Sequence, residues 1–288
     1  MSDASDYVRT YLQLQVWKDE MFTTNIPIRQ YLQSGKGTQS ANANAAYGKL
    51  MGALPKLAGS AANAAPEIFE VQGDKYSKTS LWRVFNGKGA PSEIQDALWL
   101  ALLAGQVNEK TIATYADTNL GIDCGGFVAN YWGIGRPSPT EPKPNYATGI
   151  KPRAVWGLNP KLRRTSASEI QVDDAAVFFE DVKGDDPNIA AQLKDGKYDS
   201  NTGSQAFHIG VVASVQAIAG TDLVDLDIAE SSGARASSGG TGVNVRSLGQ
   251  VKATVAKGLV WCPDGKNRIY FTGKDGDVSP YTPTFLFG

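Results

Sequence analysis

The order of helix-like and strand-like segments along the 288-residue chain predicts an α+β fold. Helical spacing of apolar residues dominates the first third, and short apolar runs separated by glycine and aspartate dominate the last part. The two kinds of segment do not alternate as they would in a repeating βαβ pattern. We therefore expect a helical N-terminal region over residues 1–110 and a second, strand-rich domain over residues 111–288.

The first region carries several helical signals. Alanine dominates residues 41–54, which indicates a helix that should end near Pro55. The alternative for this stretch is a mobile low-complexity segment. Ser92 is a candidate N-cap for a further helix with an apolar face, which Gly105 would close. An earlier helix is indicated by three residues at i, i+4 and i+7 spacing, namely Tyr7, Tyr11 and Leu14.

The second domain contains six short apolar runs that predict strands. Two polar or proline-rich stretches interrupt the domain, at about 133–168 and 183–204, and we interpret both as insertions. The predicted strands are residues 175–179, 209–215, 223–228, 243–246, 259–261 and 269–271.

Composition limits the classes of function. Hydrophobic residues make up 42% of the chain, which is enough for a large core. Charged residues make up 20% and the net charge is −1, so neither a basic phosphate-binding surface nor a nucleic-acid partner is expected. The chain has no apolar run of about 18 residues, so we expect no membrane span.

The cysteine content and the first six residues indicate the cellular compartment in which we expect the protein. Cys124 and Cys262 are the two cysteines, too few for a disulfide framework and consistent with a reducing compartment. Residues 1–6 lack the basic segment followed by an apolar one that marks a secretory signal. We therefore expect a protein that is cytoplasmic in the cell that makes it, and that would leave the cell through a specialised secretion system.

Cys124 is the candidate nucleophile. It precedes two glycines and an apolar run at helical spacing, which indicates a thiol at the first turn of a helix. The free backbone N–H groups and the positive end of the helix dipole favour thiolate there, and they can also face a developing oxyanion. Gly125 and Gly126 would let a substrate approach closely. The alternative is a buried thiol that serves as a small hydrophobic group.

His208 and Glu230 are the candidate partners of this thiol. His208 is the only histidine and begins an apolar strand, so any Cys–His mechanism must use it as the general base. Glu230 ends the next predicted strand and could accept the second imidazole N–H. Asp225 and Asp227 compete for that role, and Glu230 could equally be a solvent-facing carboxylate.

Four segments, in order, resemble the NlpC-type papain-like cysteine peptidases, which are related to the CHAP amidases. The run Asp-Cys-Gly-Gly-Phe-Val at 123–128 is similar to the family's Asp-Cys-Ser-Gly-Phe-Val signature. Residues 172–179 resemble its Gly-Asp-Leu-Val-Phe-Phe strand, and residues 208–212 resemble its His-Val-Gly-Ile-Tyr strand. Residues 228–231 fall where the family places its third polar residue, and the resemblance extends over about residues 113–250.

The resemblance implies a catalytic helix packed on a small antiparallel sheet, and cleavage of amide bonds through an acyl-enzyme without a cofactor or metal. It implies that Cys124 is the nucleophile, His208 the base and Glu230 the orienting group. Gly125, Asp123 and Tyr115 would line the substrate and oxyanion side. The family's usual substrates are peptidoglycan stem peptides.

Some positions depart from the family pattern. Gly125 replaces the usual serine, Asp173 replaces the usual glycine, and Glu230 stands where histidine is common. A tyrosine upstream of the cysteine often lines the site, and Tyr115 is the candidate despite its short spacing.

Because a signal for export is not visible, the resemblance leads us to expect a secreted antibacterial effector with an immunity or inhibitor protein as partner. Two other functions are compatible with the same residues. One is a papain-like acyltransferase or lipid amidase, which would pass the acyl group to another acceptor. The other is a catalytically inactive binding module, whose thiol would react no faster than free cysteine.

Overall fold

A computed structural model describes residues 3–17, 23–33, 35–59, 67–133, 164, 167–179, 206–221, 223–233, 242–254, 259–261 and 268–273. The predicted insertion at 183–204 and Cys262 lie outside the described residues, as does nearly all of the insertion at 133–168. The elements are a mixture of helices and antiparallel strands, which confirms the α+β class. Within the described ranges, no helix combines the length and the apolar character needed to cross a lipid bilayer.

The N-terminal region is not purely helical, because it contains two β-hairpins. The turn between the strands β3 (Ile68–Val71) and β4 (Asp74–Ser77) explains why no simple sequence pattern predicts one of these hairpins. Gln72 and Gly73 both have positive φ, at 55° and 90°, as the favoured two-residue hairpin turn requires, but Gln is not a typical residue for it. The elements are α1 (Ala4–Leu12), β1 (Leu14–Trp17), β2 (Thr23–Ile26), α2 (Gly37–Leu57), β3 (Ile68–Val71), β4 (Asp74–Ser77), α3 (Lys78–Phe85), α4 (Pro91–Leu103) and α5 (Ile112–Asn119).

The predicted helices exist with shifted ends. α2 continues through Pro55, which lies in its last turn rather than beyond its end. α4 begins at Pro91, and its N-cap is Ala90 rather than Ser92. Proline suits the first helical position, and the carboxylate of Glu93 accepts the backbone N–H of Ala90 at 2.7 Å, which is the half of a capping box that an alanine N-cap still permits.

The second domain supplies the helix α6 (Cys124–Tyr131) and the six predicted strands. The strands are β5 (Ala175–Phe179), β6 (Ala206–Ala217), β7 (Leu223–Ser232), β8 (Gly242–Thr254), β9 (Leu259–Trp261) and β10 (Arg268–Thr272). They are antiparallel and form a closed barrel in the order β10-β5-β6-β7-β8-β9. Closure follows from β10, which pairs with β5 on one side and with β9 on the other.

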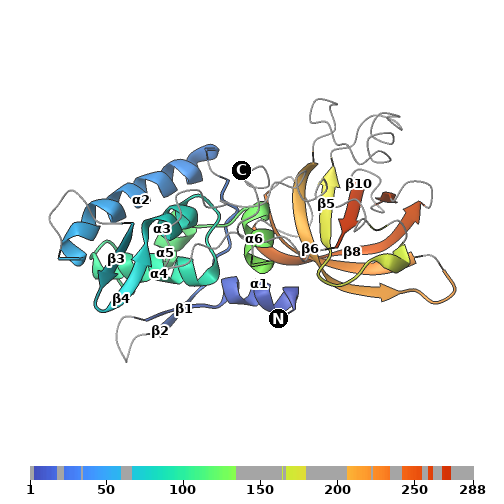
Figure 1. Ribbon diagram of the computed structural model, residues 1–288, viewed down its shortest axis with the longest axis horizontal. Coiled ribbons are helices and arrows are strands. Elements are labelled where there is room, and N and C mark those ends of the chain that lie inside the picture. Colours follow the sequence, from blue (N-terminus) through green and yellow to red (C-terminus); the bar gives the residue numbers. More distant parts are fainter. Residues whose placement is uncertain are drawn as a thin grey trace.

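α6 lies between the helical part of the molecule and the barrel (Figure 1). All eight of its residues are buried. The helix α1 packs on it through aromatic rings, with ring centroids of Tyr7 and Phe127 5.6 Å apart and those of Tyr7 and Tyr131 5.4 Å apart. The expected boundary near residue 110 therefore does not separate two independent cores, because α1 and α6 share one.

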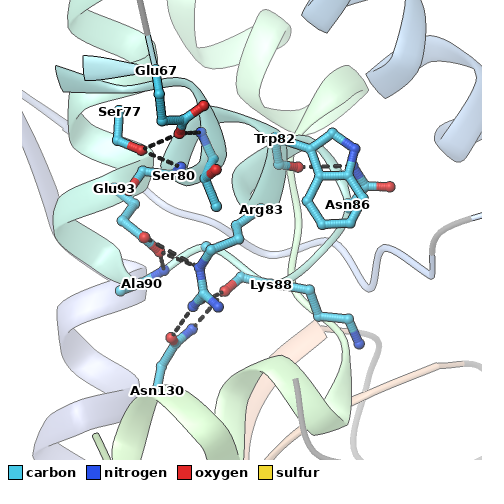
Figure 2. Close-up of polar contacts among 12 residues, drawn as sticks. Glu67, Ser77, Ser80, Trp82, Arg83, Asn86, Lys88, Ala90, Glu93 and Asn130 are labelled. Carbon is cyan, nitrogen blue, oxygen red and sulfur yellow. Dashed lines mark hydrogen bonds and ion pairs between the residues drawn. The ribbon is translucent and has the colours of Figure 1, made fainter. Parts of the chain in front are cut away.

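A buried polar cluster joins α3, α4 and α6 (Figure 2). The guanidinium of Arg83 donates to the carboxylate of Glu93 at 3.2 Å, to the side-chain oxygen of Asn130 at 2.8 Å and to the backbone carbonyl of Lys88 at 2.9 Å. Arg83 is 1% exposed, so each of these donors would be costly to leave without an acceptor. The cluster holds the catalytic-helix candidate at a defined position against the N-terminal region.

Asp173 connects the end of α6 to the barrel, and its backbone is strained. Its φ is +74°, the left-handed region that glycine adopts most easily. The phenol of Tyr131 donates to its carboxylate, and the indole N–H of Trp132 donates to its carbonyl at 3.3 Å. The position therefore combines a glycine-like backbone with a side chain that binds α6.

Replacing Arg83 by Met should lower the free energy of unfolding by about 3–5 kcal/mol, because it leaves the Glu93 carboxylate buried without its cation. The double variant Arg83→Met/Glu93→Gln should lose less, and Lys110→Met, at an exposed lysine, should change stability by less than about 0.5 kcal/mol. Urea denaturation measures all three. A double variant less stable than Arg83→Met alone would contradict this account.

Asp173→Gly and Asp173→Ala should separate the two roles of this residue. Both remove the acceptor of Tyr131, but only glycine relieves the left-handed backbone. We expect the glycine variant to be more stable than the alanine variant by about 1 kcal/mol, as measured by denaturant unfolding. Equal stabilities would show that the backbone conformation is not strained.

Candidate active site

Cys124 is the first residue of α6 and is 7% exposed. Asp123 is the N-cap, and its Oδ1 accepts the backbone N–H of Gly126 at 2.7 Å. A helix N-terminus carries a partial positive charge, which favours a thiolate at this position. The predicted placement of the thiol at the start of a helix is therefore confirmed.

The glycines after the thiol have a packing role as well. A Cβ on Gly126 would lie 2.5 Å from the carbonyl oxygen of Gly87 and 2.9 Å from the Cα of Lys88. Glycine at this position thus lets the Gly87–Lys88 backbone touch the first turn of α6. Gly125 is buried beside Cys124.

Three separate segments hold the backbone that leads into Cys124. The N–H of Ile122 donates to the carbonyl of Gln30 at 3.1 Å, and the N–H of Asp123 donates to the carbonyl of Gly87 at 2.8 Å. The hydroxyl of Ser231, on β7, donates to the carbonyl of Ile122 at 2.6 Å. The backbone just before Cys124 is therefore held in place by both the N-terminal region and the barrel.

His208 and Glu230 form a buried pair on neighbouring strands. The Nε2 of His208 and the Oε2 of Glu230 are 2.7 Å apart, and the two residues are 4% and 0% exposed. The β6–β7 register sets Val211 opposite Ala229. One step further along, Gly210 faces Glu230, so His208 lies diagonally from it on the same side of the sheet.

Because Gly210 has no side chain, it leaves room for the diagonal contact between His208 and Glu230. A Cβ there would lie 2.4 Å from the Cγ2 of Ile228 and 3.3 Å from the Cβ of Glu230. Any other residue would push into the space beside the Glu230 side chain, which reaches across to His208. The His-x-Gly spacing therefore has a steric reason in this barrel.

The structure also decides between the acidic candidates on β7. The carboxylate of Asp227 accepts a hydrogen bond from the hydroxyl of Ser214 at 2.7 Å, and Asp225 is exposed. Side chains alternate along a strand, so these odd-numbered residues face away from the side that Glu230 occupies. Among the three, Glu230 is the carboxylate that meets the imidazole.

The environment of His208 favours its charged form. Burial alone lowers the pKa of this imidazole, but hydrogen bonds to Cys124 and Glu230, together with the negative charges of both groups, outweigh burial and raise the pKa of His208 to about 9. The ring also packs at a tilt against Phe178, with centroids 5.0 Å apart. A charged imidazolium, held by the carboxylate of Glu230 and beside the sulfur of Cys124, is therefore the form of His208 that this arrangement stabilises at neutral pH.

The tyrosine beside the thiol is Tyr31, which the sequence did not indicate. Its hydroxyl lies 3.9 Å from the Sγ of Cys124, and its ring packs where a Cβ on Gly233 would be 3.2 Å from Cδ1. Burial and the nearby charges of Cys124 and Asp123 raise the pKa of Tyr31 far above its ordinary value. The phenol therefore stays protonated, and either its hydroxyl or the Cys124 thiol can be the donor in the contact between them.

Tyr115, the sequence candidate for this position, lies on α5, whose main contacts are with α2, α4 and β2. Burial raises the pKa of its phenol to about 12, and among the described residues its hydroxyl has no hydrogen-bond partner. Tyr31 was missed because it is 93 residues from Cys124 in sequence, and no local pattern surrounds it.

Within the described part of the chain, no group of three or more His, Cys, Asp or Glu side chains is placed to hold a metal ion.

Comparison of the sequence with models of known protein families, with curated proteins and with solved structures finds no significant match to any of them.

The single histidine allows a direct test of the site's electrostatics. In ¹⁵N-labelled protein without a histidine tag, the ring signals of His208 should titrate with a midpoint near 9, above the ordinary value of about 6.5. The imidazolium should persist through neutral pH and be lost as the pH rises past that midpoint. Because the carboxylate and the thiol raise the pKa, Glu230→Gln and Cys124→Ala should each move the midpoint down. A wild-type midpoint below 6.5 would contradict the ion pair.

Proposed function

We propose that this chain is a papain-like cysteine hydrolase of the NlpC type, which cleaves an amide bond through an acyl-enzyme. The observation that carries the proposal is the buried chain of contacts from Cys124 to His208 to Glu230, with the thiol at the N-terminus of α6. Nucleophile, base and orienting acid come from three elements that are separate in sequence.

The first half-reaction forms the acyl-enzyme. The Cys124 thiolate attacks the carbonyl carbon, and the electron pair of the C=O bond moves to oxygen, where the backbone N–H groups of Cys124 and Gly125 would stabilise it. The His208 imidazolium then donates its proton to the leaving nitrogen as the C–N bond breaks. The amine departs, and a thioester joins Cys124 to the acyl group.

The second half-reaction restores the enzyme. Neutral His208 takes a proton from water, the resulting hydroxide attacks the thioester, and the C–S bond breaks to release a carboxylic acid. Sulfur leaves as thiolate, and His208 is again protonated. Glu230 holds the imidazole throughout and favours its charged state.

The departures from the family pattern are compatible with this assignment. Asp173 stands where the family has glycine, and its φ of +74° is the conformation that glycine readily adopts. Gly210 occupies the glycine position of the histidine strand and makes room for Glu230. A carboxylate can orient the imidazole as a third residue whether or not the family more often uses histidine there.

The substrate that we propose is a peptide bond in the stem peptides of bacterial peptidoglycan, with action as a secreted antibacterial effector and an immunity protein as partner. This part rests on the sequence resemblance. A papain-like acyltransferase or lipid amidase would use the same Cys124 and His208 and would differ in the acceptor of the acyl group. Product analysis separates these chemistries.

Incubation with purified peptidoglycan should release fragments whose masses identify the cleaved amide. Cys124→Ala should abolish release, His208→Ala should reduce it by at least about a hundredfold, and the double variant should add little, because the two residues act as a unit. Glu230→Ala should cost less than either. Asp225→Ala, which removes an exposed acid from the same strand, is the matched control.

If the protein releases no fragments from any type of cell wall, the proposed substrate is wrong. If the acyl group instead appears on an added amine or alcohol rather than as free acid, the chain is an acyltransferase. Full activity of Cys124→Ala would overturn the cysteine mechanism itself.

A further inference from the structure

The connection between α3 and α4 places a lysine beside the carboxylate that precedes the proposed nucleophile in sequence. The ammonium of Lys88 forms an ion pair with the Oδ2 of Asp123, and the two side chains are 12% and 9% exposed. The Oδ1 of the same carboxylate caps α6 through the N–H of Gly126. One carboxylate, directly before Cys124 in sequence, therefore serves two partners at once.

The backbone of Lys88 is held rigidly, so its side chain starts from a fixed point. Its carbonyl accepts hydrogen bonds from the guanidinium of Arg83 at 2.9 Å and from the side-chain amide of Asn130 at 3.0 Å. Figure 2 shows this carbonyl turned toward Arg83 while the side chain leads away from it. Gly87, just before it, has φ +72° and accepts the N–H of Asp123.

A cation is needed beside Asp123 because the carboxylate that caps α6 is negatively charged. A carboxylate is a good N-cap, but its negative charge beside Cys124 opposes formation of a thiolate, and the effect is larger where water is excluded. Among the residues that the structure describes, the other groups that face the thiol are His208 from β6, with Glu230 from β7 behind it, and the neutral phenol of Tyr31. Lys88 removes the net charge of the cap and leaves its hydrogen bond in place.

We propose that Lys88 is a positioning residue of the active site, whose ammonium neutralises the capping carboxylate of Asp123 and thereby maintains the thiolate of Cys124. The N-terminal region would then be part of the catalytic machinery, because Lys88 and the Arg83 that holds it both belong to that region. The inference rests on the proposed role of Cys124 as nucleophile.

The test is the pH dependence of iodoacetamide alkylation, quantified at Cys124 by peptide mass spectrometry. Lys88→Met should slow alkylation at pH 7 by about tenfold and move the pH–rate profile to higher pH, because an uncompensated Asp123 disfavours the thiolate. Lys88→Arg, which keeps the charge, should stay near the wild-type rate. Lys110→Met, which removes an exposed lysine, is the control for net charge.

A second variant separates charge from packing. In Lys88→Met/Asp123→Asn the cap can still accept the Gly126 N–H but carries no charge, so alkylation should be faster than in Lys88→Met alone. If Lys88 only holds the chain in place, the double variant will be no faster than the single one, and the proposal falls. Thermal unfolding of each variant verifies that the rates refer to folded protein.

Alkylation reports on the thiol alone, so it is independent of the substrate. If Lys88→Met alkylates like the wild type while amide hydrolysis by the wild type is intact, this inference fails and the proposed function stands. If the wild type hydrolyses no amide while Lys88→Met shows the slowed profile, the proposed function fails and the electrostatic role of Lys88 stands.

Discussion

The complete burial of α6 is the constraint on which the rest of the structure depends. A buried helix N-terminus needs partners for its free N–H groups, and here Asp123 supplies one. A buried carboxylate in turn needs a cation, which Lys88 provides, and the backbone of Lys88 is fixed by Arg83 and Asn130. The polar groups around α6 thus form one connected set, and the N-terminal region and the barrel each contribute part of it.

The barrel brings the carboxylate of Glu230 to the imidazole of His208 at a buried position. A lone imidazole there would be neutral, because burial disfavours its charge. The contacts with Glu230 and Cys124 reverse that preference, so the charge of His208 depends on two residues far from it in sequence. The same burial that makes the pair costly to form makes it strong once formed.

The N-terminal region is therefore more than an appendage to the domain that contains the barrel. α1 packs its aromatic rings on α6, the segment around Gln30 holds the backbone before the thiol, and Tyr31 faces the sulfur. Sequence patterns suggested a boundary near residue 110 because helical periodicity gives way to strands there. Shared packing and hydrogen bonds cross that boundary, and periodicity cannot report them.

Sequence alone determined the α+β class, the six strands, and the roles of Cys124 and His208 as candidates, because periodicity, a glycine-flanked thiol and a single histidine are local signals. Only the tertiary structure closed the strands into a barrel, brought Glu230 rather than Asp225 or Asp227 to the imidazole, and placed Tyr31 beside the thiol. Those outcomes depend on strand register and on the approach of distant segments. The role of Lys88 could not be predicted from sequence for the same reason. Its ion pair with Asp123 joins residues 35 positions apart, and it forms because the Gly87–Lys88 backbone packs against Gly126.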